Sequence, residues 1–314
     1  MEAILQLIIL AVGFVMLIKG ADWFVDGAVG IAEKLGIPQL VIGLTIVAMG
    51  TSAPEAAVSI SAALKGSAEI TIGNIVGSNI LNILIILGLS AVITSLAVAK
   101  STIRYEIPFM IAITLMLMFM GGDGTISLME GVIMWVVFIA YLVYLFVLIK
   151  LEPQDEIEEE NDGGKKTKSM PKSLLFIVIG LALIIAGSSL AVDAATELAR
   201  FFGLSERFIG LTIVALGTSL PELVTSVAAA RKGNADIAIG NIVGSNIFNI
   251  LFVVGTSALI VPIPYALAFN ADFLVATGAA VMLLVCCLRK KSLNRISGLL
   301  MLIAYAAYFV FILM

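Results

Sequence analysis

Two glutamates, each preceded by a pair of hydroxyl residues, are the side chains of this sequence best suited to chemistry. Glu55 ends the segment Gly-Thr-Ser-Ala-Pro-Glu, and Glu222 ends Gly-Thr-Ser-Leu-Pro-Glu. A threonine and a serine stand four and three residues before each glutamate, namely Thr51, Ser52, Thr218 and Ser219. Residues three and four apart share one face of a helix, so hydroxyl and carboxylate oxygens can converge there. Oxygen groups of this kind bind hard cations.

Each glutamate directly follows a proline that must interrupt its helix. Pro54 has no N–H for the carbonyl of Gly50, and Pro221 has none for the carbonyl of Gly217. In lipid an unpaired carbonyl is costly unless protein, water or an ion satisfies it. We therefore expect both breaks to line a cavity.

A second motif adds neutral oxygens. Gly-Asn-Ile-Val-Gly-Ser-Asn begins at residue 73 and again at residue 240. It places Ser78 four residues before Asn82, and Ser245 four residues before Asn249, so each hydroxyl and amide share a helical face. The remaining asparagines of the motif are alternative ligands, but we expect them instead to hydrogen-bond between helices or to satisfy the broken backbone; these are Asn74, Asn79, Asn241 and Asn246.

The composition shows that these motifs lie in a membrane. Of the 314 residues, 61% are hydrophobic and 13% are charged, against about 25% charged residues in soluble domains. A net charge of −4 argues against binding to nucleic acid. Ten apolar stretches predict ten transmembrane helices, at about 3–32, 38–64, 69–96, 103–120, 126–150, 173–202, 206–230, 236–260, 267–288 and 294–313. The sequence therefore predicts an all-α membrane protein.

A buried carboxylate in such a protein needs a positive partner. At the bilayer centre it costs about 2.5–3.5 kcal/mol, and Lys65 and Lys232 stand ten residues beyond the two glutamates, at helix ends. Bound cations are the remaining compensation. The chain has no histidine, and its two cysteines are adjacent in an apolar run, so oxygen ligands must hold the ions. Such ligands favour calcium or sodium over zinc or copper.

The motifs belong to an internal repeat. At an offset of 167 residues (209 − 42), 32 of the 47 positions from Ile42 to Gly88 are identical to those from Ile209 to Gly255. Five predicted helices lie in 1–150 and five in 173–314, joined by an acidic linker at 151–172. An odd number of spans inserts the second copy upside down. Inverted repeats with broken helices at the midplane are typical of secondary transporters.

The positive charges predict the orientation. In a ten-span chain, one side of the membrane holds most of the lysines and arginines, whereas the other holds only Lys65, Arg200 and Arg207. The richer side should be cytoplasmic. We therefore expect a plasma-membrane protein with both termini outside the cytoplasm and the linker inside.

The paired motifs and the five-plus-five arrangement resemble the sodium/calcium exchanger family of the calcium/cation antiporters, especially prokaryotic calcium/sodium antiporters. This resemblance implies ten helices, alternating access, and calcium and sodium as transported ions, with no further cofactor. It implies that Glu55 and Glu222 are shared central ligands, with oxygens contributed by Thr51, Ser52, Thr218 and Ser219. Flanking sodium sites would be completed by Ser78, Ser245 and the carbonyls of Ala48 and Ala215.

One departure from the family pattern affects the charge of the site. Some relatives carry aspartate where this chain has Asn249, and the equivalent residue in the first half is Asn82. The site therefore has two carboxylates rather than three. A three-to-one exchange of sodium for calcium would move one net charge, whereas a two-to-one exchange would be electrically silent.

Other functions remain to be weighed against sodium/calcium antiport. A calcium/proton exchanger is the alternative, although its relatives usually show Gly-Asn-x-x-Glu, where this chain has Gly-Asn-Ile-Val-Gly. A cation channel would need a ring of carboxylates around an axis normal to the membrane, which two inverted copies do not make. An enzyme is not expected, since Ser52 and Ser219 have no histidine or lysine base beside them.

Overall fold

The computed structural model describes residues 2–65, 68–151, 169–203 and 215–313, and these residues are almost entirely helical. The all-α prediction is therefore confirmed. The predicted linker falls mostly on residues 152–168, and the start of the predicted span 206–230 falls on residues 204–214; both lie outside the described residues.

The first half contains α-helices, π-helical segments (η1 to η3), a short 3-10 segment (η4) and two short strands. Their bounds are α1 Glu2–Leu35, α2 Gln39–Ile42, η1 Gly43–Val47, α3 Ala48–Thr51, α4 Ala53–Leu64, α5 Glu69–Leu81, η2 Asn82–Leu87, α6 Gly88–Ile93, β1 Leu96–Ala97, η3 Thr102–Glu106, α7 Ile107–Met120, η4 Gly121–Asp123, β2 Thr125–Ile126 and α8 Leu128–Leu151.

Where it is described, the second half repeats the order of α-helices and strands, but α15 replaces η3, α7 and η4 as one continuous helix. Its elements are α9 Met170–Phe201, α11 Ala215–Thr218, α12 Leu220–Arg231, α13 Ala235–Phe248, the π-helical η6 Asn249–Val254, α14 Gly255–Ile260, β3 Ile263–Pro264, α15 Phe269–Lys290, β4 Ser292–Leu293 and α16 Arg295–Leu313.

Within the described part of the chain, eight helical spans are long and apolar enough to cross a membrane. A ninth candidate is the pair Gln39–Thr51 and Ala53–Leu64, which is bent by 50° at its break. The break is at Ser52, whose ψ of 7° ends α3, and Pro54 lies in the first turn of α4, where a missing N–H is tolerated. Ser219 has the same conformation between α11 and α12, and Pro221 follows it. The helix breaks predicted from the prolines are therefore confirmed.

Two of the spans form the centre of the bundle. In the most apolar stretch of Ala235–Ile260, 94% of the residues are buried, and 78% are buried in Ile70–Ile93, against 17–33% in the other six spans. These central spans contain the Gly-Asn-Ile-Val-Gly-Ser-Asn motifs. The outer helices instead expose leucine, isoleucine, valine and phenylalanine side chains, as expected for helices that face lipid.

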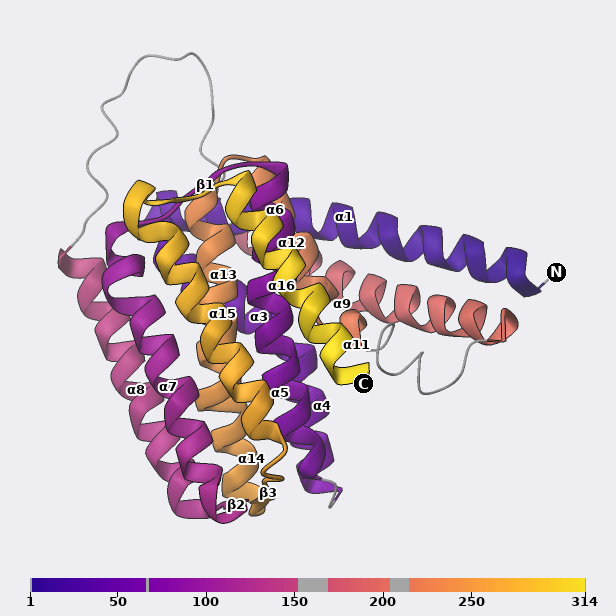
Figure 1. The fold of residues 1–314 in the computed structure, drawn as a ribbon. Coiled ribbons are helices and arrows are strands. Elements are labelled where there is room, and N and C mark those ends of the chain that lie inside the picture. The colour runs from indigo at the N-terminus through magenta and orange to yellow at the C-terminus, as the bar shows by residue number, and fades with distance from the viewer. Residues whose placement is uncertain (1, 66–67, 152–168, 204–214, 314) are drawn as a thin grey trace.

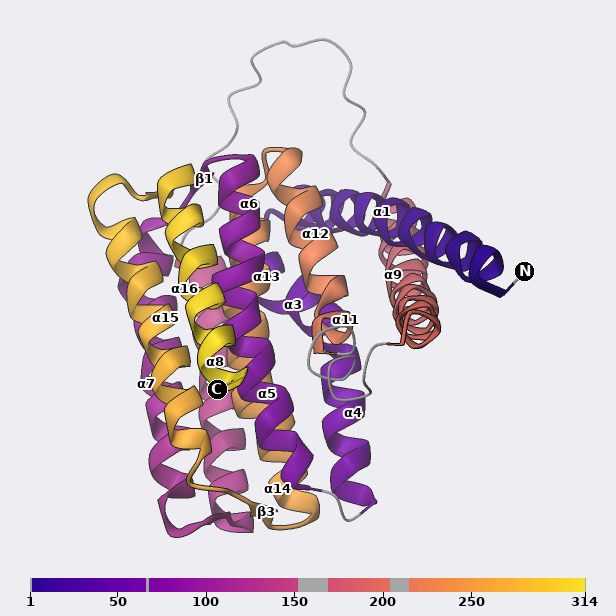
Figure 2. The same ribbon diagram turned by 45° about the vertical axis from the view of Figure 1, so that its right-hand side comes forward.

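Helices α1 and α9 form a separate pair. Both views show them side by side at a steep angle to the upright bundle (Figures 1 and 2). Glycines allow the two backbones to approach closely, because a Cβ added at Gly20 would lie 2.8 Å from the carbonyl oxygen of Gly180, and one added at Gly187 would lie 2.8 Å from that of Gly13. Small residues that let two helix backbones approach closely are a common basis of helix contact in membranes.

Two short antiparallel strand pairs join the halves. β1 pairs with β4, matching Leu96 with Leu293, and β2 pairs with β3, matching Ile126 with Ile263. At the offset of 167, β1 is equivalent to β3 and β2 to β4, so the two pairs are the same contact made twice. They lie at opposite ends of the bundle (Figure 1).

The glycine packing of α1 against α9 predicts a clear difference between two Gly→Ala substitutions. Gly180→Ala should lower the melting temperature of the purified protein, since its Cβ would lie 2.6 Å from the backbone nitrogen of Phe24, and overpacking of this kind costs about 1–3 kcal/mol. Gly278→Ala in α15 is the matched control, because its Cβ would meet nothing within 4 Å. It should leave the melting temperature unchanged or raise it through helix propensity. An equal loss of stability in both variants would contradict close packing of α1 and α9.

Candidate ion-binding site

The two glutamates lie at equivalent places in the fold. Glu55 is in the first turn of α4 and Glu222 in the first turn of α12, each just after a helix break. Their exposed fractions are 1% and 0%. Both carboxyl groups are therefore shielded from solvent at the two points where the bundle helices are interrupted.

A serine from the opposite half contacts each glutamate. The Ser52 hydroxyl donates to Glu222 Oε1 at 2.8 Å, and the Ser219 hydroxyl donates to Glu55 Oε1 at 3.3 Å. The sequence predicted hydroxyls and carboxylates on one face of the same helix. The structure instead carries the serines across to the other copy, because each serine is the residue at which its helix breaks.

Several buried side-chain oxygens have no hydrogen-bond partner within the described part of the chain, and four of these are carboxylate or amide oxygens related in pairs by the repeat. These four are Glu55 Oε2, Glu222 Oε2, Asn82 Oδ1 and Asn249 Oδ1. A buried acceptor without a donor costs about 1–3 kcal/mol, and more when it is charged, so this set is costly unless something positive occupies the space beside it.

The asparagine oxygens are left without donors because their amide nitrogens are used elsewhere. Asn82 Nδ2 donates to Asn246 Oδ1 at 2.9 Å, and Asn249 Nδ2 donates to Asn79 Oδ1 at 3.1 Å. Asn79 and Asn246 also donate to each other's backbone carbonyls, at 3.3 and 3.2 Å. These bonds fix the orientation of the Asn82 and Asn249 amides. The Oδ1 atom of each amide then points away from the hydrogen bond that its Nδ2 atom makes.

Both of these asparagines begin a π-helical segment, Asn82 in η2 and Asn249 in η6. Segment η2 packs against α12, which contains Glu222, and η6 packs against α4, which contains Glu55. Each orphaned amide oxygen therefore comes from an element in contact with the opposite half's glutamate helix. π-helical turns are often found at functional sites, and nothing in the sequence predicted them here.

The other motif asparagines brace the broken helices. Asn74 Nδ2 donates to Ser59 Oγ at 2.9 Å and lies 3.4 Å from the backbone carbonyl of Glu55. Asn241 makes the equivalent bonds to Ser226 and Glu222. The predicted interhelical role of these asparagines is confirmed.

The predicted flanking ligands are only partly brought together. Ser245 Oγ lies 3.4 Å from the carbonyl oxygen of Ala48. Ser78 is buried and lines a cavity of about 300 Å³ between α5, α15 and α16. Thr51 is buried and donates to Asn241 Oδ1 at 3.0 Å.

The second half is less fully described at these positions. Thr218 is half-buried at the end of α11. Ala215 begins α11, and its side chain lies outside the described set. The sodium-ligand assignments for these two residues therefore stay predictions.

Within the described residues, no lysine or arginine forms an ion pair with either glutamate. Lys232 directly follows α12, the helix that contains Glu222, but contacts Asp22 and Asp26 on α1. In the same residues, no three acidic, histidine or cysteine side chains gather as a conventional metal cluster. The donor set is thus two carboxylates with neutral amide, hydroxyl and carbonyl oxygens, which suits calcium or sodium as cargo.

Comparison with known proteins identifies the family of the chain. The family described as sodium/calcium exchanger protein matches twice, at residues 5–147 and 172–314. The chain belongs to the sodium/calcium exchanger family. It is 31% identical to the sodium/calcium exchanger MaX1 of Methanosarcina acetivorans, covering 96% of this chain and 97% of MaX1. It is 38% identical to the inner membrane protein YrbG of Escherichia coli, covering 90% of this chain and 89% of YrbG.

The fold agrees with this family membership. The structure superimposes on the sodium–calcium exchanger NCX_Mj with a TM-score of 0.85 and 32% sequence identity, over 99% of each chain. This member of the family is therefore a multi-pass membrane antiporter of cations, and not an enzyme.

The orphaned oxygens predict how ion binding depends on each carboxylate. Calcium should raise the melting temperature of the purified protein, since a ligand that binds only the folded state stabilises it. Glu222→Gln should remove this calcium-dependent shift, because it replaces a negatively charged ligand by a neutral one and leaves Glu55 as the remaining carboxylate for a divalent ion. Glu106→Gln is the matched control, because Glu106 is equally buried and accepts a hydrogen bond from Tyr144, away from the breaks. A calcium-dependent shift retained by Glu222→Gln would exclude this residue as a ligand.

Proposed function

We propose that this protein exchanges sodium for calcium across the cell membrane by alternating access. The observation that carries the proposal is the set of four buried oxygens without donors, two from glutamates and two from asparagines. One divalent ion or two monovalent ions would neutralise the two carboxylates. The sodium/calcium exchangers that this chain resembles, MaX1 and NCX_Mj, support the choice of ions.

The proposed architecture has ten transmembrane helices in two inverted repeats, residues 1–150 and 173–314, with the acidic linker 151–172 between them. Its seventh span, predicted at 206–230, contains α11 and α12. The duplicated strand contact supports the inversion, because equivalent strand pairs lie at opposite ends of the bundle (Figure 1). An inverted pair of repeats can exchange conformations, so that a site between them opens to one side of the membrane and then to the other.

The proposed ligands follow from this symmetry. Glu55 and Glu222 are the shared carboxylates, and Asn82 and Asn249 present amide oxygens to the same space. The flanking sodium positions would use Thr51, Ser52, Thr218, Ser219, Ser78, Ser245 and the carbonyls of Ala48 and Ala215. The contact between Ser245 and the Ala48 carbonyl supports one of these positions.

The orientation is proposed from the distribution of charge. Arg289, Lys290 and Lys291 at the end of α15 lie on the side that holds most of the lysines and arginines, and such loops face the cytoplasm. Both termini would then lie outside the cytoplasm.

A calcium/proton exchanger is the competing function, since orphaned carboxylate oxygens could also accept protons. The amide oxygens Asn82 Oδ1 and Asn249 Oδ1, which lack donors, would serve calcium in either exchanger, since amide oxygens are calcium ligands. Sodium coupling is favoured by the relatives, because MaX1 and NCX_Mj are both described as sodium/calcium exchangers.

Reconstitution into liposomes tests the choice of coupling ion. Sodium-loaded liposomes placed in sodium-free medium should take up radioactive calcium, and the uptake should stop when an ionophore dissipates the sodium gradient. A pH gradient imposed without sodium should drive no calcium uptake. The reverse pattern would replace sodium by protons as the coupling ion.

Glu55→Gln provides the control within the same assay. It should abolish sodium-driven calcium uptake while the protein still inserts in the membrane, because one carboxylate cannot balance a calcium ion. Sodium-driven uptake by this variant at normal calcium affinity would overturn the proposed site.

A further inference from the structure

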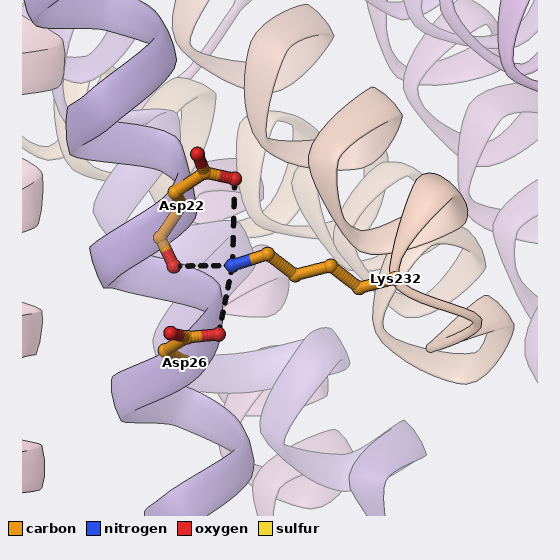
Figure 3. A network of polar contacts seen from close by, with 3 residues as sticks. All are labelled: Asp22, Asp26 and Lys232. Atoms are coloured by element: carbon orange, nitrogen blue, oxygen red, sulfur yellow. Dashed lines mark hydrogen bonds and ion pairs between the residues drawn. The ribbon is translucent and has the colours of Figure 1, made fainter.

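An ion network joins α1 to the end of α12, outside the proposed binding site. The Lys232 ammonium lies 2.7 Å from Asp26 Oδ1 and 3.4 Å from Asp22 Oδ1, and it donates to the Asp22 backbone carbonyl at 2.7 Å (Figure 3). Two carboxylates and a carbonyl thus hold one ammonium. The three contacts fix the end of α12 against one face of α1.

The repeat supplies a second copy of the same charges. At the offset of 167, Lys232 is equivalent to Lys65 and Asp26 to Asp193. These two residues lie at the end of α4 and on α9. In the described residues, neither Lys65 nor Asp193 takes part in an ion pair, and both side chains are exposed.

The packing of the helices shows the same asymmetry. Helix α1 packs extensively along α12, whereas the equivalent helices α9 and α4 are hardly in contact. A cleft of about 660 Å³ lies beside the network between α1, α6 and α12, and it extends along α12 from Lys232 to Leu223, the neighbour of Glu222. The contact between α1 and α12 is therefore closed in this conformation, whereas the equivalent contact between α9 and α4 is open.

We propose that Lys232 with Asp22 and Asp26 is a latch that stabilises the present conformation, and that Lys65 with Asp193 forms the equivalent latch in the opposite one. The proposal rests on alternating access between inverted repeats, as proposed above. When the two repeats exchange conformations, α9 packs along α4 in the way that α1 now packs along α12. The Lys232 latch then opens as the Lys65 latch closes.

The two latches are unequal. The residue of α9 equivalent to Asp22 is Ser189, whose hydroxyl donates to the Ile185 carbonyl of its own helix. The second latch therefore has one carboxylate where the first has two. This difference biases the exchanger toward the conformation in which Lys232 is paired, because an extra carboxylate strengthens the attraction for the ammonium.

Paired cysteine probes in lipid nanodiscs test the proposal, since both faces of the protein are then accessible. Val227→Cys lies in the cleft beside the first latch, and Ile60→Cys is its equivalent on α4. Each is introduced with Cys286→Ser and labelled with a hydrophilic maleimide. Lys232→Gln should speed labelling at position 227 about two- to fivefold, the range expected for an exposed ion pair, and should slow labelling at position 60.

The second latch is tested by the matched changes. Lys65→Gln should shift both labelling rates in the direction opposite to Lys232→Gln, so that labelling becomes slower at position 227 and faster at position 60. Ser189→Asp should do the reverse of Lys65→Gln, speeding position 227 and slowing position 60 by strengthening the second latch. Lys232→Arg should keep the wild-type rates, because it retains the charge.

Two results would overturn the proposal. One is a change in the same direction at both probes, which would show general loosening of the protein. The other is an unchanged rate at position 227 in Lys232→Gln or in Lys65→Gln, because position 227 reports the less populated conformation and therefore responds most to either latch. Labelling needs no ion gradient, so these results are separate from the calcium-uptake assay: an exchanger driven by protons would still show the opposed shifts.

Discussion

The candidate site is built around two buried carboxyl groups that have no counter-charge among the residues that the structure describes. Glu55 and Glu222 are buried, each accepts one serine hydroxyl, and each keeps one oxygen without a donor. A fold that had to be stable by itself would pair these groups with lysine or arginine. In the proposed function, ions that can leave again complete these groups, whereas an ion held by permanent partners would not be released.

The helices around this site divide into parts with different tasks. The central spans with α5 and α13 are the most buried and hold the asparagines in fixed hydrogen bonds. The breaks before α4 and α12 present the glutamates. The pair α1 and α9 is a body held together by tight glycine packing; it lies at a steep angle to the upright helices (Figure 2) and contacts them where α1 packs along α12. The Lys232 network joins this body to the bundle at an exposed position, where an ion pair is weak enough to open.

Much of this arrangement was predictable from local sequence, and the rest depends on contacts between the halves. Pro54 and Pro221 fix the helix breaks because a missing N–H acts locally, and the apolar stretches fix the spans. The crossing of Ser52 to Glu222 was not predictable, since spacing along one helix says nothing about the opposite copy. The π-helical turns at Asn82 and Asn249 leave no sequence pattern. The partners of Asp26 were also hidden, because Lys232 is 206 residues away.

The reciprocal hydrogen bonds between Asn79 and Asn246 have a consequence for how this sequence can evolve. Each copy supplies the groups that orient the asparagine amides of the other copy, so neither half forms this network alone. A substitution in one repeat removes a hydrogen bond from the other repeat. A tolerated change will therefore often need a matching change at the equivalent position. Two genes carrying the halves separately would have to change together, whereas fusion in one chain lets both copies be inherited as a unit.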